Sequence, residues 1–202
     1  EGYRTSGYTE DGDSNLTLAG CNLPDPNWGQ PTDAVRPWDR LEIFVGGRPC
    51  PIYPQSLKNL DSSVTTRPDF CEGDTIRKVT CKVPEGTGES NEIILKNGGN
   101  PHFTGNGTLY LRYLRPKVNG FNPKEVDTKG EDVEVNGDNF GVDFGKVSIK
   151  MGDEELSVKE GSLTHSKFTV IVPPGEGTAK SIYVTVDGQT NITHREDPGV
   201  FR

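Results

Sequence analysis

The chain contains VPEGTGESNEIILKNGG at residues 83–99 and repeats the same pattern as VPPGEGTAKSIYVTVDG at residues 172–188. The two stretches align without a gap, so that Pro84 matches Pro173. Each has an apolar strand ending in Val-Pro, then a Gly-rich turn, then a second strand of alternating residues. A repeat of this kind indicates two copies of one β unit. Differences between the copies are then the places where a specific function can lie.

The repeat continues toward the N-terminus. LTLAGCNL at residues 16–23 matches VEVNGDNF at residues 133–140, which aligns Gly20 with Gly137. The offset between the copies is 117 residues there, 106 residues around Gly46 and 89 residues in the stretch first quoted. The N-terminal copy therefore carries two insertions, of 11 residues (117 less 106) and 17 residues (106 less 89).

Composition favours an all-β fold. The 202 residues suit two domains of about 100 residues each. Only 31% are hydrophobic, and 25 Gly and 15 Pro indicate many turns and thin cores. Short apolar runs alternate with period two, and Gly, Pro, Asn and Asp separate them. We expect strands at residues 16–19, 41–45, 78–83, 92–96, 108–114, 117–121, 133–136, 146–151, 156–158, 168–172 and 181–186. This series predicts two tandem immunoglobulin-like β-sandwiches.

The charge of the chain argues against two classes of partner. A net charge of −8 and a pI near 5.0 disfavour nucleic acid and anionic membranes, since both attract basic surfaces. No apolar run approaches the roughly 20 residues that span a bilayer. No signal peptide is visible, so we expect a mature chain or one that is not exported. We expect neither nucleic-acid binding nor membrane insertion of this chain.

Three N-x-S/T sequons, at Asn15, Asn106 and Asn191, predict an extracellular glycoprotein. Such triplets also arise by chance in Thr-rich chains. Asn106 and Asn191 follow the repeated strand at similar places in the two copies, which favours glycosylation over chance. We expect N-linked glycans and no other cofactor.

Four cysteines, all in the N-terminal copy, predict disulfides in an oxidising compartment. Cys50 aligns with Leu156 and Cys81 with Val170. In the second copy this pair would be an apolar core contact, so in the first it can be a bridge across the sandwich. Such a bridge would stabilise the fold by roughly 3–4 kcal/mol.

The other two cysteines flank the insertions. Cys21 begins the first and Cys71 lies near the end of the second, so a bridge between them would tie the added loops together. Four cysteines allow three pairings, and the sequence does not choose among them. No C-x-x-C spacing occurs and the three histidines are scattered, so we expect no metal site.

The sequence shows no catalytic motif. It lacks the G-x-S-x-G elbow of many hydrolases. The carboxylate pair Glu154–Glu155 would point to opposite faces of a strand. The turn VPEGTGES lacks the Lys-Ser/Thr ending of a phosphate-binding loop. The stretch DGDSN at residues 11–15 lacks the turn glycine and closing glutamate of a calcium loop. We therefore expect no catalytic residue and no enzyme activity.

The stretch PKVNGFNP…GEDVEVNGDNFG, residues 116–141, resembles the opening of an IPT/TIG domain, which is an immunoglobulin-like sandwich. FTVIVPPGEG at residues 168–177 is similar to the second half of such a domain. The N-terminal copy also resembles the family, through GGRPC, VTCKVPEGTG and YLRP. Its residues 1–13 depart from the pattern, since they lack the Pro-x-Val…Pro opening.

The resemblance implies an arm at residues 1–14 and IPT/TIG-like domains at 15–115 and 116–202. Members of the family are modules of cell-surface receptors, adhesion proteins, secreted proteins and some transcription factors. The acidic, sequon-bearing chain is similar to the extracellular members. The resemblance implies binding or scaffolding, and implies no chemistry.

The insertions offer one candidate binding surface. They are rich in Pro and carry Trp28 in the first and Phe70 in the second. Exposed aromatic residues on rigid loops are frequent anchors at interfaces. Tryptophan is also usually largely buried, so a core position for Trp28 is the alternative. On this reading the chain is the ectodomain fragment of an adhesion or recognition receptor, and its partner is another cell-surface protein.

The chain ends offer a second candidate. The arm carries Tyr3 and Tyr8, and the chain closes with a short stretch that contains Phe201. We expect the arm to add a strand to the incomplete edge of the second domain in another copy. Such a head-to-tail contact does not close, so it would build a fibre or surface layer. A frayed terminus is the alternative. Self-association as a structural subunit is the function that this reading predicts.

Overall fold

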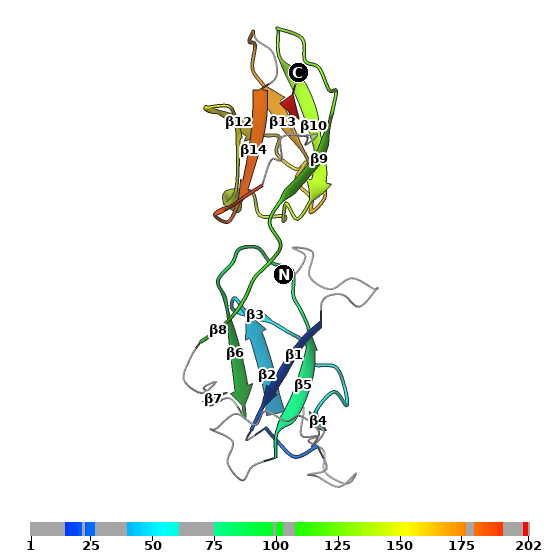
Figure 1. Ribbon diagram of the computed structural model, residues 1–202, viewed down its shortest axis with the longest axis vertical. Helices are drawn as coiled ribbons and strands as arrows, with labels where there is room; N and C mark the ends of the chain where they lie inside the picture. Colours follow the sequence, from blue (N-terminus) through cyan, green and yellow to red (C-terminus); the bar gives the residue numbers. More distant parts are fainter. Residues whose placement is uncertain are drawn as a thin grey trace. The chain divides into compact units, whose positions relative to one another are not determined.

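The computed structural model describes residues 15–21, 23–26, 40–60, 75–98, 100–102, 108–176, 180–191 and 200–201. Residue contacts divide the chain into two compact units. Among the described residues, the C-terminal unit comprises Glu85–Glu89 and everything from Arg112 onward, and the N-terminal unit comprises the rest. Apart from 3₁₀ structure at Arg40 and at Phe144–Lys146, the regular structure described is β (Figure 1). No helix in the described part of the chain is long and apolar enough to cross a membrane.

The N-terminal unit has two antiparallel sheets (Figure 1). The first contains, in spatial order, β1 (Asn15–Gly20), β5 (Arg77–Lys82) and β4 (Lys58–Asn59). The second contains, in spatial order, β3 (Arg48–Pro49), β2 (Leu41–Val45), β6 (Asn91–Asn97) and β7 (Asn100–His102), and β8 (Leu109–Leu111) also pairs with β6. Alternate residues of β2, β5 and β6 are buried, as the period of a strand requires.

The C-terminal unit is a single eight-stranded arrangement that folds over one core. Its spatial order is β15 (Gln189–Thr190), β14 (Lys180–Val186), β11 (Val147–Met151), β12 (Glu154–Val158), β13 (Lys167–Val172), β10 (Glu131–Asp138) and β9 (Lys117–Asn122), and β16 (Val200–Phe201) pairs with β14. Strand β12 pairs with both β11 and β13, and so connects the two layers of the sandwich.

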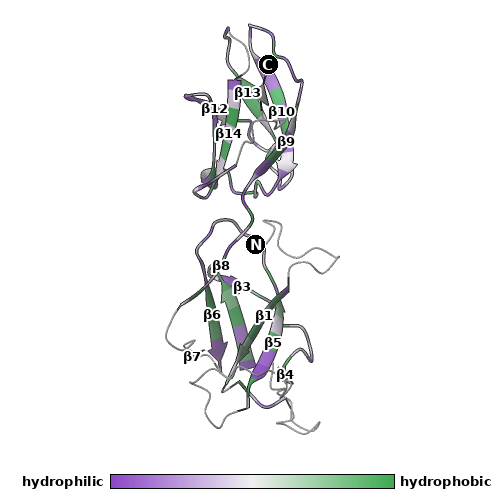
Figure 2. Ribbon diagram, in the orientation of Figure 1, coloured by the Kyte–Doolittle hydropathy of each residue, from purple (hydrophilic) through white to green (hydrophobic). Residues whose placement is uncertain are grey.

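Apolar side chains lie along the strands and polar ones at the turns, as Figure 2 shows. In the C-terminal core, the rings of Phe140 and Phe168 meet edge to face with centroids 4.8 Å apart, an arrangement that aromatic pairs favour. Every strand that the sequence predicts is present, with ends that shift by a few residues. The all-β sandwich fold is confirmed. The sequence missed β3, β4, β7, β15 and β16, which have only two or three residues each.

Candidate interaction surfaces

Strand β1 lies at the edge of its sheet. It pairs with β5 on one side, and no described residue pairs with its other side. Its counterpart in the repeat, β10, pairs with β13 on one side and with β9 on the other. The N-terminal unit therefore leaves open, among the described residues, a position that β9 fills in the C-terminal unit. We call the unpaired side of Asn15–Gly20 the β1 edge.

The core of the N-terminal unit is less well covered than its counterpart, in both of its sheets. In the C-terminal unit, Val118 and Phe121 of β9 are buried in the core, and Val135 of β10 is completely buried. The repeat aligns Val135 with Leu18 of β1, which is only half-buried. Leu109 of β8 pairs with a core-facing residue of β6, yet 43% of its surface is exposed. Both leucines lose part of the stabilisation that complete burial would give.

Gly20 at the end of β1 differs from its aligned partner in its surroundings. A Cβ atom at Gly137 would lie 2.0 Å from the backbone oxygen of Lys117 in β9, so only glycine allows β9 to approach. A Cβ atom at Gly20 would have nothing within 4 Å. Gly20 is also not among the residues with positive φ. The described residues give no steric or conformational reason for glycine at this position.

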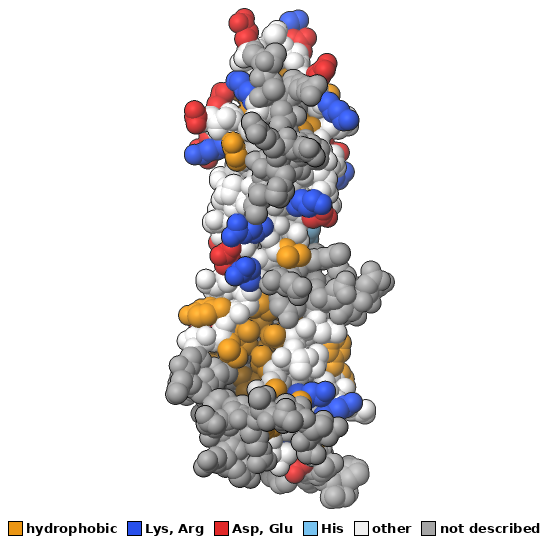
Figure 3. All heavy atoms as spheres, in the orientation of Figure 1, with side chains coloured by type: hydrophobic (Ala, Val, Ile, Leu, Met, Phe, Trp, Pro, Cys, Tyr) orange, Lys and Arg blue, Asp and Glu red, His pale blue; other side chains and the backbone are white. Residues whose placement is uncertain are grey.

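A second candidate surface is the outward side of β2, β6 and β8, which we call the β6 face. It consists of Phe44, Ile94, Tyr110, Glu42, Glu92 and Lys96. The register pairs Phe44 with Ile94 and Tyr110 with Glu92, and Tyr110 is 60% exposed. The Lys96 ammonium lies 4.7 Å from the centre of the Phe44 ring, at cation–π distance. Hydrophobic side chains are exposed on the N-terminal unit in the view of Figure 3.

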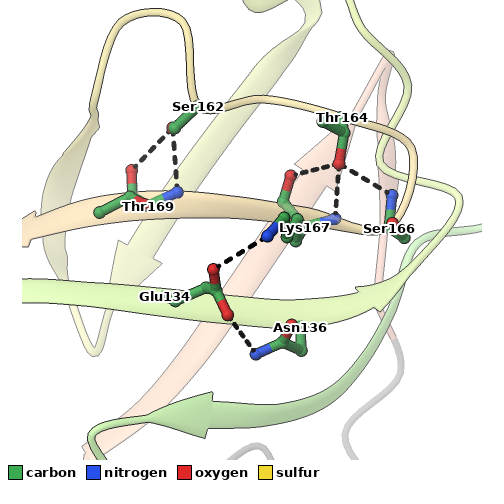
Figure 4. Close-up of polar contacts among 7 residues, drawn as sticks. All are labelled: Glu134, Asn136, Ser162, Thr164, Ser166, Lys167 and Thr169. Atoms are coloured by element: carbon green, nitrogen blue, oxygen red, sulfur yellow. Dashed lines mark hydrogen bonds and ion pairs between the residues drawn. The ribbon is translucent and has the colours of Figure 1, made fainter.

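Charged side chains on β10 and β13 of the C-terminal unit pair with each other, unlike those of the β6 face. In the C-terminal unit Lys167 bonds to Glu134 at 3.3 Å, and the Asn136 amide donates to the same carboxylate at 3.2 Å (Figure 4). The Asn136 hydrogen bond and the Lys167 ammonium lower the pKa of Glu134 below its usual value of 4.5. On the β6 face the described contacts give the carboxylates and the ammonium no ion pair.

One predicted disulfide is confirmed. Cys50 and Cys81 form a bridge with their Cα atoms 5.5 Å apart, and both residues are buried. Their aligned partners Leu156 and Val170 are buried in the C-terminal core, as the repeat predicts. Cys21 is also disulfide-bonded. Because Cys71 lies outside the described residues, the Cys21–Cys71 pairing stays a prediction.

The sequons lie in different surroundings. Asn15 is exposed at the start of β1, where its side-chain oxygen accepts a hydrogen bond from the Tyr53 hydroxyl at 2.8 Å. Asn191 is only 7% exposed, and its Oδ1 accepts a hydrogen bond from the backbone N–H of Val184 at 2.7 Å. A glycan would be attached to the amide of that buried side chain, so the geometry favours Asn15 over Asn191. Asn106 lies outside the described residues.

The predicted aromatic anchors Trp28, Phe70, Tyr3 and Tyr8 also lie outside the described residues, so their roles stay predictions. The backbone of Phe201 is described, and it pairs with Lys180 as part of β16. Its side chain is not described.

The edge of the second domain that the arm was expected to join is largely occupied. Strand β15 pairs with one end of β14 and β16 with the other, and Asn191 bonds to Val184 between them. On the opposite side of this unit β9 pairs with β10 and is itself the edge strand. The β1 edge differs, because no described residue occupies beside β1 the place that β9 occupies beside β10.

Metal-binding groups do not gather in the described part of the chain, where no cluster of three or more His, Cys, Asp or Glu residues could hold an ion. The expectations of no metal and no catalysis stay predictions.

Comparison with known proteins identifies the family of the C-terminal unit. The curated proteins give no match. Among solved structures, the chain is similar to a structural genomics protein of unknown function from Bacteroides thetaiotaomicron VPI-5482, with 28% identity and a TM-score of 0.37, covering 44% of this chain and 22% of that one. It is similar to the surface glycan-binding protein PbSGBP-B from Prevotella bryantii, with 16% identity and a TM-score of 0.44, covering 90% of this chain and 37% of that one.

A third similar structure is the extracellular region of plexin A4, with 12% identity and a TM-score of 0.39, covering 93% of this chain and 23% of that one. The chain therefore spans well under half the length of these proteins. Residues 116–198, which form most of the C-terminal sandwich, match the IPT/TIG domain family, so this part of the chain is an IPT/TIG domain.

Proposed function

We propose that this protein is a non-catalytic extracellular glycoprotein that serves as a structural subunit and self-associates by strand addition into a fibre or surface layer. Its N-terminal sandwich is a second, divergent IPT/TIG-like domain. The observation that carries the proposal is the β1 edge, which lacks among the described residues the strand that covers β10 in the C-terminal sandwich. An unpaired edge offers backbone hydrogen-bonding groups to a strand from another chain.

Two features support the extracellular location. The Cys50–Cys81 bridge lies in the core of the N-terminal sandwich, and such structural disulfides persist in oxidising compartments. Asn15 begins an exposed sequon at the start of β1, where a glycan could project into solvent. A glycan at this end of the strand would also limit how far an added strand could extend along the β1 edge.

The mass of the native protein tests the proposal. Light scattering with negative-stain imaging should show particles far larger than the 22.1 kDa chain. Ala19→Glu places a negative charge on an exposed residue of β1 and should reduce the assembly at least tenfold, because charged side chains on an edge strand oppose pairing. Ser157→Glu is the matched control, since β12 is paired on both sides. A monodisperse native particle of one chain plus glycan would refute self-association as the function.

A recognition module is the second candidate function, and the β6 face favours it. In the C-terminal unit, the position of the Phe44–Ile94 pair is taken by Lys150 and Tyr183, a more polar pair. The N-terminal face is therefore the more apolar of the two, and exposed apolar surface rimmed by charges is typical of binding sites. The predicted loop anchors Trp28 and Phe70 would extend this recognition surface.

Binding of the labelled chain to intact cells tests this second function. Tyr110→Ser should lower saturable binding, because it removes a 60% exposed aromatic ring from the β6 face. Tyr183→Ser, which removes an exposed tyrosine from the corresponding face of the other unit, is the control. Equal binding by both variants would exclude the β6 face as the recognition surface.

A further inference from the structure

The β1 edge has the features of a binding site for one particular strand. This inference rests on the proposed self-association and names the segment that performs it. We propose that the β1 edge binds the N-terminal segment, residues 1–14, of a second copy of the chain. The added strand runs antiparallel to β1, with its backbone against Gly20 and its tyrosine side chains beside Leu18.

Gly20 indicates how closely the added strand approaches. In the C-terminal unit, the aligned residue Gly137 has no Cβ atom, and the backbone oxygen of Lys117 occupies the space that a Cβ atom at residue 137 would need. Gly20 has open space in that direction and no positive φ. Glycine weakens a strand unless another backbone comes close. A strand from a second chain, placed as β9 is, supplies the reason for glycine at this position.

The partly covered core indicates what the strand must carry. Strand β9 contributes Val118 and Phe121 to the C-terminal core, and its ladder with β10 has a register shift between Asn136 and Gly137. Leu18 of β1 remains partly exposed, and no described residue covers it as β9 covers Val135. The partner strand therefore needs apolar or aromatic side chains that face inward on the two sides of a bulge.

The N-terminal segment meets this requirement. It has more than the six residues needed to match β1, and it carries Tyr3 and Tyr8. Residues five apart point to opposite sides of a regular strand. One bulge of the kind found in β9 brings both rings to the same side. The tyrosines then bury their rings beside Leu18 and keep their hydroxyl groups near water.

Charge favours the same segment. Residues 1–14 contain four acidic residues and one basic residue. The sheet next to the β1 edge carries Lys58 on β4 and Lys78 and Lys82 on β5. Lys78 and Lys82 lie opposite Ala19 and Asn15 of β1, on its outward side. An acidic strand that joins this sheet is drawn to a basic surface, although the chain as a whole is acidic.

The substitution Gly20→Val tests the proposal in the full chain. A side chain there meets no described atom within 4 Å, so we expect an unchanged thermal unfolding midpoint. It blocks close approach of a second backbone, so we expect at least a tenfold loss of assembly by sedimentation velocity. Gly120→Val is the matched control, because Gly120 also lies in a strand with open space and no positive φ. Assembly of Gly20→Val at the native level would overturn the inference and leave self-association itself intact.

Peptide binding separates the inference from the proposed function. The peptide EGYRTSGYTEDGDS, residues 1–14, should bind the dilute chain, and binding should fall at least tenfold in Gly20→Val and with a peptide carrying serine at both tyrosines. Binding by a chain that does not self-associate would support the site while refuting the proposed assembly. Tighter binding of PKVNGFNP, residues 116–123, would assign the edge to a strand of the β9 type and overturn the choice of segment.

A third outcome would show that residues 1–14 bind the β1 edge of their own chain. If Gly20→Val lowers the unfolding midpoint of a monomeric chain and the peptide does not bind, the chain's own segment fills the edge. That outcome would overturn binding in a second copy.

Discussion

Single polar side chains complete the edges of the C-terminal sandwich. Asn191 is buried beside β14, where its Oδ1 accepts from the N–H of Val184 and its own backbone N–H donates to the carbonyl of Val184 at 2.9 Å. One residue thereby forms both hydrogen bonds that a neighbouring strand would have formed at this position. A buried backbone N–H without such a partner would be costly. The sequon that contains Asn191 thus overlaps a residue with a structural role.

Asn191→Ala should lower the free energy of unfolding of the C-terminal unit by about 1–2 kcal/mol, because it leaves the N–H of Val184 without its acceptor. Urea unfolding followed by near-UV circular dichroism measures this change. The neighbour Thr190, which is exposed and bonds to Thr185, is the control: Thr190→Ala should cost less than about 0.5 kcal/mol. Equal effects would contradict a structural role for the Asn191 amide.

A second residue of the C-terminal unit responds to pH. Asp187 Oδ2 accepts hydrogen bonds from Lys146 Nζ at 2.8 Å and from the Thr87 hydroxyl at 3.0 Å. The Lys146 hydrogen bond first, and the Thr87 bond to a smaller extent, hold the pKa of Asp187 below its usual 3.8, although partial burial opposes them. A carboxyl whose pKa is lowered by folding stabilises the fold when it is ionised, above the pKa that it has in the unfolded chain. This stabilisation is lost as the pH falls through the folded value.

Asp187→Asn should therefore lower stability at pH 7 by less than about 1 kcal/mol, since Asp187 and Lys146 are both about a third or more exposed to solvent. The difference between wild type and variant should shrink as the pH falls below 3.8. Unfolding by urea at pH 7, 4 and 2.5 measures it. Asp153→Asn is the control, since Asp153 is an exposed turn residue. A difference that grows toward low pH would show that the carboxylate does not stabilise the fold.

At the scale of elements, the sequence predicts the strands well because each long strand alternates and ends at Gly, Pro or Asn. The boundaries of β2 are predicted to the residue, and β14 differs by one. Strands of two or three residues, such as β3 and β16, are too short to show any period. The β1 edge could not be found from β1 alone. To recognise the unpaired side of β1, one must know that β9 pairs with β10 in the other unit. The missing Pro-x-Val opening was the only sequence feature that indicated the absence of such a strand.

The disulfide between Cys50 and Cys81 of β5 is a strong constraint on the N-terminal sandwich. It joins residues 31 apart in the chain, and closing a loop of that length should stabilise the fold by about 3–4 kcal/mol. Cys50→Ala/Cys81→Ala should lower the unfolding free energy of the N-terminal unit by at least that amount, since both positions are buried. Guanidinium unfolding of the oxidised protein measures it. The C-terminal transition is the internal control and should not move; a loss below about 1 kcal/mol would contradict the prediction.

At the scale of the whole molecule, two electrostatic effects act on assembly in opposite directions. Each copy carries a net charge of −8, so two copies repel each other at long range. The acidic N-terminal segment and the lysines of β4 and β5 attract each other at short range. Exposed ion pairs contribute at most about 1 kcal/mol each, so the few local attractions are weak. The repulsion involves the entire charge of both copies, and we expect it to dominate at low salt.

Assembly should therefore increase when sodium chloride is raised from 10 mM to 150 mM, a range in which the Debye length falls from about 30 Å to about 8 Å. Screening over these distances removes the repulsion between whole copies, while backbone hydrogen bonds and buried tyrosine rings at the β1 edge are little affected by salt. Light scattering at constant protein concentration measures the change in mass. Gly20→Val should remain monomeric at both salt concentrations, because screening does not restore the approach of a second backbone. If assembly of the native chain instead weakens as salt rises, the attraction of the local ion pairs exceeds the repulsion between the net charges of the two copies. The lysines of β4 and β5 are then the dominant attraction at this contact.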